Sequence, residues 1–306
     1  MQLLSRFLGL FLVLSHCCAF AFENTNRDDE SAEPSKQPRF GRRFDREKKK
    51  SLRGMSGSSF ADISGLKKMT WNVGDTTREA LVYLPPSTST SKKVPLIFAF
   101  HGHGGTSGYA ARKLAFHVTW PEAICIYPQG LPTAVPVIDP EGQRNGWQKN
   151  IGDQDDRDLR FFDRMLATMK SDYEIDERRI YSSGHSNGGY FTYILWAARG
   201  ETFAALAPIA GTMVLRHSEN LKPIPIIHVA GEKDPIVRFR LQEWTMERDR
   251  KLNECVSEGK PAGNFCTEYS SPKGAPVVTF IHPGGHEVPE GAIKRITQFF
   301  QEHPKK

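Results

Sequence analysis

From about residue 60 onward, short uninterrupted apolar runs alternate along the chain with longer segments whose apolar residues have helical spacing. A strand that is apolar throughout is typical of a sheet covered on both faces. The pattern therefore predicts an α/β fold with a mostly parallel central sheet and helices on both faces. The apolar runs predict strands at 79–84, 94–100, 123–127, 179–182, 224–229 and 277–280, and the helical spacing predicts helices at 157–169, 188–198 and 291–303.

The N-terminal segment has the pattern of a secretory signal peptide. One basic residue, Arg6, is followed by the uncharged apolar run 7–22, with small residues at Ala19 and Ala21. This predicts a signal peptide at residues 1–21, cleaved after Ala21, and export to the extracellular space or a periplasm. A retained membrane anchor is the alternative, but the run is shorter than the roughly 20 residues that a spanning helix needs. We therefore expect no stable membrane insertion after cleavage.

Residues 22–59 are polar and rich in charge, which predicts a disordered basic linker ahead of one catalytic domain at 60–306. The whole chain of 306 residues has a formal net charge of +6, and the segment 23–55 holds ten basic against seven acidic side chains. The remainder is nearly neutral, so the charge gives no argument for nucleic-acid binding. A hydrophobic fraction of 39% is enough for a globular enzyme or binding domain.

The strongest local motif is Gly184-His185-Ser186-Asn187-Gly188, between a predicted strand and a predicted helix. Gly-x-Ser-x-Gly in this position predicts a nucleophile elbow, in which the small glycines allow a sharp turn that exposes the serine hydroxyl. The backbone N–H of Asn187 begins the helix and points to where an oxyanion would form. The alternative is an ordinary glycine-rich turn that contains a serine.

Two further residues follow predicted strands and complete a catalytic set. Asp234 comes 48 residues after Ser186, and His286 comes 52 residues after Asp234. The order serine, acid, histidine is that of the α/β-hydrolase fold. A serine needs a histidine base to become a nucleophile, and the acid orients the imidazole. Taken singly, Asp234 could be a turn residue or helix cap and His286 a loop histidine.

The segment His101-Gly102-His103-Gly104-Gly105 directly follows the predicted strand 94–100. Its glycines allow a backbone N–H, most directly that of His103, to form the second half of an oxyanion hole with Asn187. The two histidines resemble a metal pair, but no suitably spaced acidic partners accompany them. We therefore expect neither a metal nor any other cofactor.

Together these motifs resemble secreted carboxylester hydrolases, the group that includes feruloyl esterases and extracellular polyhydroxybutyrate depolymerase-like enzymes. The resemblance covers about residues 70–303 and rests on LIFAFHGHGG, IYPQG, NGW, IDERRIYSSGHSNGGYFTYIL, IIHVAGEKDPIV and PGGHEVPEG. It implies the α/β-hydrolase fold, the triad Ser186, Asp234 and His286, and a pocket tryptophan at Trp147. The chain departs from the family in lacking cysteines near that tryptophan and in having HEVP at the histidine.

Three cysteines follow the predicted signal peptide. Cys125 lies in an apolar run, and this position predicts a buried free thiol. Cys255 and Cys266 flank a short polar loop, and in an exported protein we expect them to form a disulfide. Two free surface thiols are the alternative.

The sequence as a whole predicts a secreted serine esterase that acts through an acyl-enzyme on feruloyl or acetyl esters of plant-wall polysaccharide. A polyhydroxyalkanoate depolymerase and a peptidase of the same fold are alternatives within the hydrolases. A catalytically inactive binding module attached to an envelope is the alternative from another class.

Overall fold

The computed structural model describes residues 60–89, 92–136, 138–214, 216 and 221–306. They lie in the second of two compact units, Ser58–Lys306. The signal peptide and the basic linker predicted at 1–21 and 22–59 lie outside the described residues. Within the described ranges, no helix is long and apolar enough to cross a membrane.

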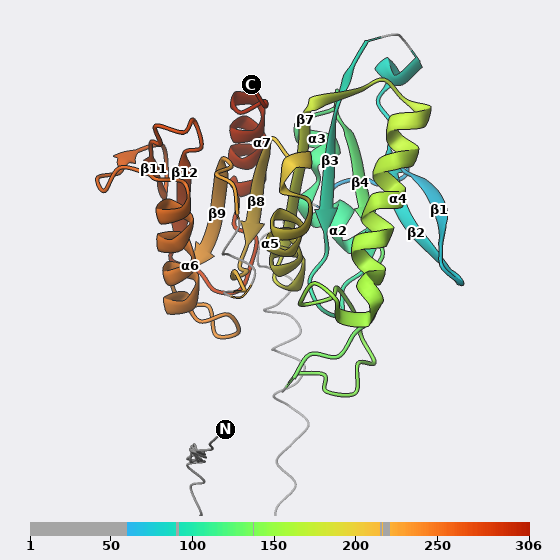
Figure 1. Ribbon diagram of the computed structural model, residues 1–306, viewed down its shortest axis with the longest axis horizontal. Coiled ribbons are helices and arrows are strands. Elements are labelled where there is room, and N and C mark those ends of the chain that lie inside the picture. The colour runs from blue at the N-terminus through green and yellow to red at the C-terminus, as the bar shows by residue number, and fades with distance from the viewer. Residues whose placement is uncertain (1–59, 90–91, 137, 215, 217–220) are drawn as a thin grey trace, which may run out of the picture. The chain divides into compact units, whose positions relative to one another are not determined.

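The described residues form a ten-stranded sheet that runs through this unit (Figure 1). In spatial order its strands are β1 (Lys67–Val73), β2 (Thr76–Tyr83), β4 (Ile124–Pro128), β3 (Val94–Phe100), β7 (Ile175–His185), β8 (Ala205–Ile209), β9 (Ile226–Gly231), β12 (Val277–His282), β11 (Cys266–Tyr269) and β10 (Lys260–Pro261). The strands from β4 to β12 pair in parallel, and the outer strands at both edges pair antiparallel. A second small sheet pairs β5 (Leu131–Pro132) with β6 (Asn145–Gly146).

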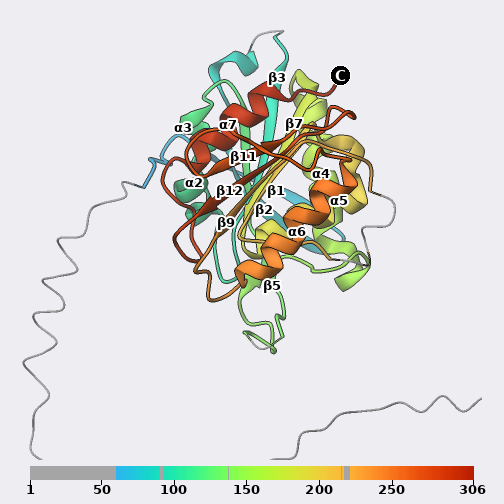
Figure 2. The same ribbon diagram turned by 90° about the vertical axis from the view of Figure 1, so that its left-hand side faces the viewer.

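Helices cover both faces of the large sheet. One face carries α4 (Arg157–Asp172), α5 (Asn187–Arg199) and α6 (Phe239–Leu252), and the other carries α2 (Ser107–Leu114), α3 (Phe116–Thr119) and α7 (Ala292–Glu302). Figure 2 shows the two layers on opposite sides of the strands. Short 3₁₀ helices occur at Pro86–Ser89, Asp153–Asp156 and Gly200–Thr202.

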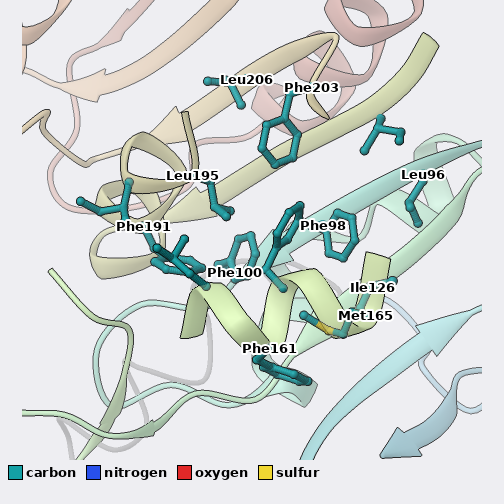
Figure 3. Close-up of a cluster of buried hydrophobic side chains, with 14 of the residues drawn as sticks. Leu96, Phe98, Phe100, Ile126, Phe161, Met165, Phe191, Leu195, Phe203 and Leu206 are labelled. Carbon is teal, nitrogen blue, oxygen red and sulfur yellow. The ribbon is translucent and has the colours of Figure 1, made fainter. Parts of the chain in front are cut away.

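The central strands are apolar throughout because both of their faces are covered. Every residue of β3 is buried. Since successive strand side chains point to opposite faces, Phe98 and Phe100 enter the cluster beneath α4 and α5, whereas Ile97 and Ala99 enter the cluster beneath α2 and α7. Figure 3 shows Phe98 and Phe100 within the first cluster, beside Phe191 of α5. The packing confirms the predicted α/β class.

The predicted elements agree with the structure where the apolar pattern is strong and fall short elsewhere. The strand predicted at 94–100 coincides with β3, and the helix predicted at 157–169 lies within α4. The strand predicted at 179–182 is only the central part of β7. Sequence patterning predicted neither β8 nor α6, although both contribute to the candidate site.

Candidate active site

A serine occupies the sharp turn between β7 and α5. Ser186 has φ 57° and ψ −117°, a conformation that non-glycine residues rarely adopt and that is common at functional sites. Its backbone N–H donates to the Ile209 carbonyl of β8 at 2.8 Å. A Cβ on Gly184 would lie 2.3 Å from the Gly188 oxygen, and one on Gly188 would lie 2.3 Å from the Phe100 oxygen. Only glycine fits at these two positions, so the Gly-x-Ser-x-Gly sequence makes the tight turn possible.

Asp234 and His286 are hydrogen-bonded to each other. Asp234 follows β9 and is buried, and its Oδ1 accepts the backbone N–H groups of Ile236 at 2.8 Å and Val237 at 2.9 Å. Its Oδ2 accepts Nδ1–H of His286 at 2.7 Å and Nε2–H of Gln242 at 3.0 Å. A neutral imidazole that donates from Nδ1 presents Nε2 as an acceptor, which is the tautomer a general base needs.

His286 also lies beside the turn that carries the serine. Its ring centroid is 4.8 Å from that of His185, the residue before Ser186. Burial, together with His286 nearby, lowers the pKa of His185 to about 3, so His185 is neutral at ordinary pH. In the described part of the chain no hydrogen bond joins the Ser186 hydroxyl to His286. Such contacts commonly tighten only when substrate binds.

The loop after β3 lies next to the first residue of α5. A Cβ on Gly146 would lie 2.8 Å from Nδ1 of His103 and 2.9 Å from Oδ1 of Asn187, so both residues border the same glycine. Gly104 donates its N–H to the Asn145 carbonyl at 2.7 Å, whereas no acceptor among the described residues takes the N–H of His103 or of Asn187. These two donors are therefore available to a ligand, and the N-terminus of α5 adds its own partial positive charge.

The side chains of the two histidines in this loop are engaged within the protein. His101 donates from Nδ1 to the Gly102 carbonyl at 2.7 Å and accepts the Gly130 N–H on Nε2 at 2.9 Å. Burial lowers the pKa of His101 to about 4. Nε2 of His103 lies 3.0 Å from Oδ2 of Asp139. Among the described residues no group of three or more His, Cys, Asp or Glu side chains could hold a metal ion.

The structure buries Trp147, which the sequence predicted to line a substrate pocket. Trp147 is 0% exposed, and its ring packs 5.1 Å from that of Phe100 and 5.5 Å from that of Phe191. Its indole N–H donates to the His101 carbonyl at 2.8 Å, and its backbone N–H donates to Oδ1 of Asn187 at 2.7 Å. The loop after β4 folds back through β5 and β6, which places this tryptophan in the core beneath the loop that follows β3.

The predicted disulfide between Cys255 and Cys266 is also absent, since both thiols are unpaired. Cys266 is buried in the apolar cluster beneath α7. Cys255 follows α6, with its Sγ 3.9 Å from the Ala275 carbonyl. The residue after it, Val256, donates its N–H to the Ser270 carbonyl beyond the end of β11, whereas Cys266 begins that strand. Burial raises the pKa of the third thiol, that of Cys125 in β4.

Two polar residues that contact the candidate site were not predicted. Gln242 reaches Asp234 from the buried face of α6. Asp139 lies within the irregular segment after β4 and accepts backbone N–H groups from Gln143 at 3.1 Å and Arg144 at 2.8 Å, besides its contact with His103. A run of polar residues at helical spacing from Gln242 onward was the available signal for the first, and the sequence offers none for the second.

Comparisons with known proteins agree with the fold and with the predicted class of enzyme. A model of the prolyl oligopeptidase family matches residues 138–237, a segment that holds Ser186 and Asp234 but ends before His286. The chain is 28% identical over 191 residues to a bifunctional acetylxylan esterase/xylanase of Neocallimastix patriciarum, covering 61% of this chain and 26% of that protein. It is 24% identical over 219 residues to a probable feruloyl esterase C of Aspergillus flavus, covering 69% of this chain and 76% of that one.

The chain thus spans about a quarter of the length of the first relative and three quarters of the second. An acetyl xylan esterase from Aspergillus awamori superposes with a TM-score of 0.58 at 15% identity, covering 77% of this chain and 99% of that one. A ferulic acid esterase from Anaeromyces mucronatus gives 0.53 at 17% identity, covering 78% and 90%. These likenesses confirm the α/β-hydrolase fold. The named relatives are carboxylic ester hydrolases, and the resemblance to feruloyl esterases is confirmed.

Proposed function

We propose that this protein is a secreted serine carboxylester hydrolase in which Ser186 is the nucleophile, His286 the general base and Asp234 the residue that orients it. The observation that carries the proposal is the 2.7 Å hydrogen bond between Asp234 and His286 beside a strained serine turn. Burial of a carboxylate is unfavourable unless hydrogen bonds compensate for it, and Asp234 accepts four of them, one from His286. The acid is thereby held in place to orient the imidazole.

The reaction proceeds in two halves. The Ser186 oxygen attacks the ester carbonyl carbon while Nε2 of His286 takes the hydroxyl proton, and the resulting tetrahedral intermediate expels the alcohol, which receives that proton. Water then attacks the acyl-enzyme, with His286 again taking and returning a proton, and the free acid leaves. The N–H groups of His103 and Asn187 donate to the oxyanion in both halves, a contribution worth roughly 3 kcal/mol for each donor.

The substrate class that best fits the comparisons is a feruloyl or acetyl ester of plant-wall polysaccharide. Support comes from the relatives, named as acetylxylan and feruloyl esterases, and secretion fits a polymeric substrate outside the cell. Trp147 is buried, so its ring cannot contact an aromatic acyl group. Other side chains near Ser186 must therefore set the preference between feruloyl and acetyl groups.

One experiment tests both the reaction and the substrate class. The protein without residues 1–21 is assayed on methyl ferulate, acetylated xylan and short p-nitrophenyl esters, beside the Ser186→Ala variant. Hydrolysis of at least one plant-wall ester by the wild type alone supports the proposal. Equal hydrolysis by both proteins would overturn the assignment of Ser186, and hydrolysis of p-nitrophenyl esters alone would overturn the substrate class.

A peptidase is a second candidate, because residues 138–237 match the prolyl oligopeptidase family. Acyl transfer from an ester or from an amide uses the same set of residues. A panel of short aminoacyl-p-nitroanilides in the same assay separates the two: cleavage at a kcat/KM above that for the esters would favour the peptidase.

A further inference from the structure

The buried face of α6 is polar, which is unusual for a helix that covers a sheet. Gln242, Thr245, Asp249 and Asn253 follow one another at helical spacing, and all are 0% exposed. Figure 1 shows α6 lying along β9, the strand that ends just before Asp234. Burial of polar groups is unfavourable unless each finds a hydrogen-bond partner, so the partners of these side chains indicate what the face is for.

Gln242 has an orientation fixed by its two acceptors. Its Nε2 donates to Oδ2 of Asp234 at 3.0 Å and to the Val237 carbonyl at 2.7 Å. Both partners only accept, so the amide nitrogen must point toward Asp234, and Oε1 must point away from it. Oε1 is buried and has no hydrogen-bond partner among the described residues.

His228 of β9 is also buried, and burial lowers its pKa to about 4. Its Nε2 has no hydrogen-bond partner among the described residues. On its other edge, Nδ1 of His228 lies 2.8 Å from the Tyr193 hydroxyl, and that hydroxyl lies 2.7 Å from Oδ2 of Asp249.

We propose that Gln242 is a positioning residue for Asp234: its amide, which also donates to the Val237 carbonyl, donates to the carboxylate oxygen that accepts from His286. The inference rests on the proposed function, because Asp234 matters only if it orients a catalytic His286. It deepens that function by assigning a role to a buried helix face that contacts no substrate.

The positioning role is tested by comparing Gln242→Met with a control on the same helix face, Thr245→Val. Methionine keeps the length of the side chain but cannot donate, and valine removes a hydroxyl that does not contact Asp234. Loss of a hydrogen bond to a charged group should lower kcat of Gln242→Met by about ten- to a hundredfold, with KM within about twofold of the wild type. The control should lose thermal stability but keep its kcat.

Labelling of Ser186 by a fluorophosphonate separates this inference from the function on which it rests. A wild type that resists the label would overturn both. A wild type that labels rapidly, with Gln242→Met labelling at the same rate and a fall in melting temperature alone, would overturn only the positioning role.

Discussion

Helices α6 and α7 pack against opposite faces of the same part of the sheet, yet they bury different chemistry. The buried face of α7 is apolar and includes Ile296, Phe299 and Phe300. The buried face of α6 is mostly polar. It includes Gln242, Thr245 and Asp249, with Met246 as its apolar residue. Both helices contact β9. The sheet itself therefore does not demand a polar helix on either side.

The contrast indicates which helix only covers the sheet and which also supports the chemistry. An apolar face stabilises the fold in proportion to the area that it removes from water. A polar face contributes little net stability, because hydrogen bonds formed inside mainly replace those made to water. Gln242 of α6 reaches Asp234, whereas no hydrogen bond joins a described residue of α7 to the candidate triad. Substitution of Gln242 should therefore affect catalysis more than stability, and substitutions on the buried face of α7 the reverse.

The largest effect is expected where the α6 side meets the triad. In Asp234→Asn, Oδ1 can still accept from Ile236 and Val237, but the amide nitrogen would face the donors of Gln242 and His286. The imidazole loses its orienting acceptor, and kcat should fall by about 10⁴-fold. Steady-state kinetics on a p-nitrophenyl ester measures this. A fall of less than about tenfold would remove Asp234 from the triad.

On α7 the corresponding experiment is Phe299→Ala. Phe299 is fully buried, and truncation of a core phenylalanine costs about 3–5 kcal/mol. Urea denaturation should show this loss, while kcat of the remaining folded protein stays within about twofold of the wild type. A large fall in kcat with unchanged stability would contradict the covering role of α7.

Asp249→Asn sharpens the comparison through the pH dependence of stability. The folded-state pKa of Asp249 is raised to about 7 from an ordinary value of 3.8. The native state therefore holds a proton that the unfolded chain releases above 3.8, so the free energy of unfolding falls as pH rises and is lowest above 7. Asp249→Asn lacks this loss. Its urea midpoint relative to the wild type should rise between pH 4 and pH 8, and a constant difference would contradict burial of the carboxyl.

The smallest effect concerns the serine side of the site. Trp147→Phe keeps an aromatic ring against Phe100 and Phe191 but removes the indole donor to the His101 carbonyl. Loss of one buried hydrogen bond should cost about 1–3 kcal/mol of stability. Because the ring does not face substrate, kcat/KM for methyl ferulate and for p-nitrophenyl acetate should fall by the same factor. A loss confined to the aromatic ester would return Trp147 to the pocket.

These expectations also show what sequence alone could predict. Ser186 was predictable because a strained turn requires glycines at fixed positions, and β3 because burial on both faces leaves an uninterrupted apolar run. The sequence pattern did not predict α6, because the buried residues of this helix are mostly polar and interrupt the apolar periodicity. Patterning assumes that the buried face is apolar, and that assumption fails where a helix carries a hydrogen-bonded row.

Trp147 and the cysteine pair differ from expectation for another reason. The position of Trp147 depends on how the long loop after β4 folds back, and the pairing of Cys255 with Cys266 depends on how β11 lies relative to the end of α6. Both depend on contacts between segments far apart in the chain. Short separation along the sequence suggested a bridge, but Cys266 is buried in the cluster beneath α7 and Cys255 lies near the Ala275 carbonyl.

The central claim, that hydrolysis passes through an acyl group on Ser186, can be tested directly. The protein is mixed with excess p-nitrophenyl acetate, quenched in acid within the first turnovers and digested for mass spectrometry. We predict a burst of p-nitrophenol that matches the enzyme concentration, and one acetyl group on the peptide that contains Ser186. Steady hydrolysis with no burst and no acetyl group on that peptide, or an adduct on another residue, would contradict the account.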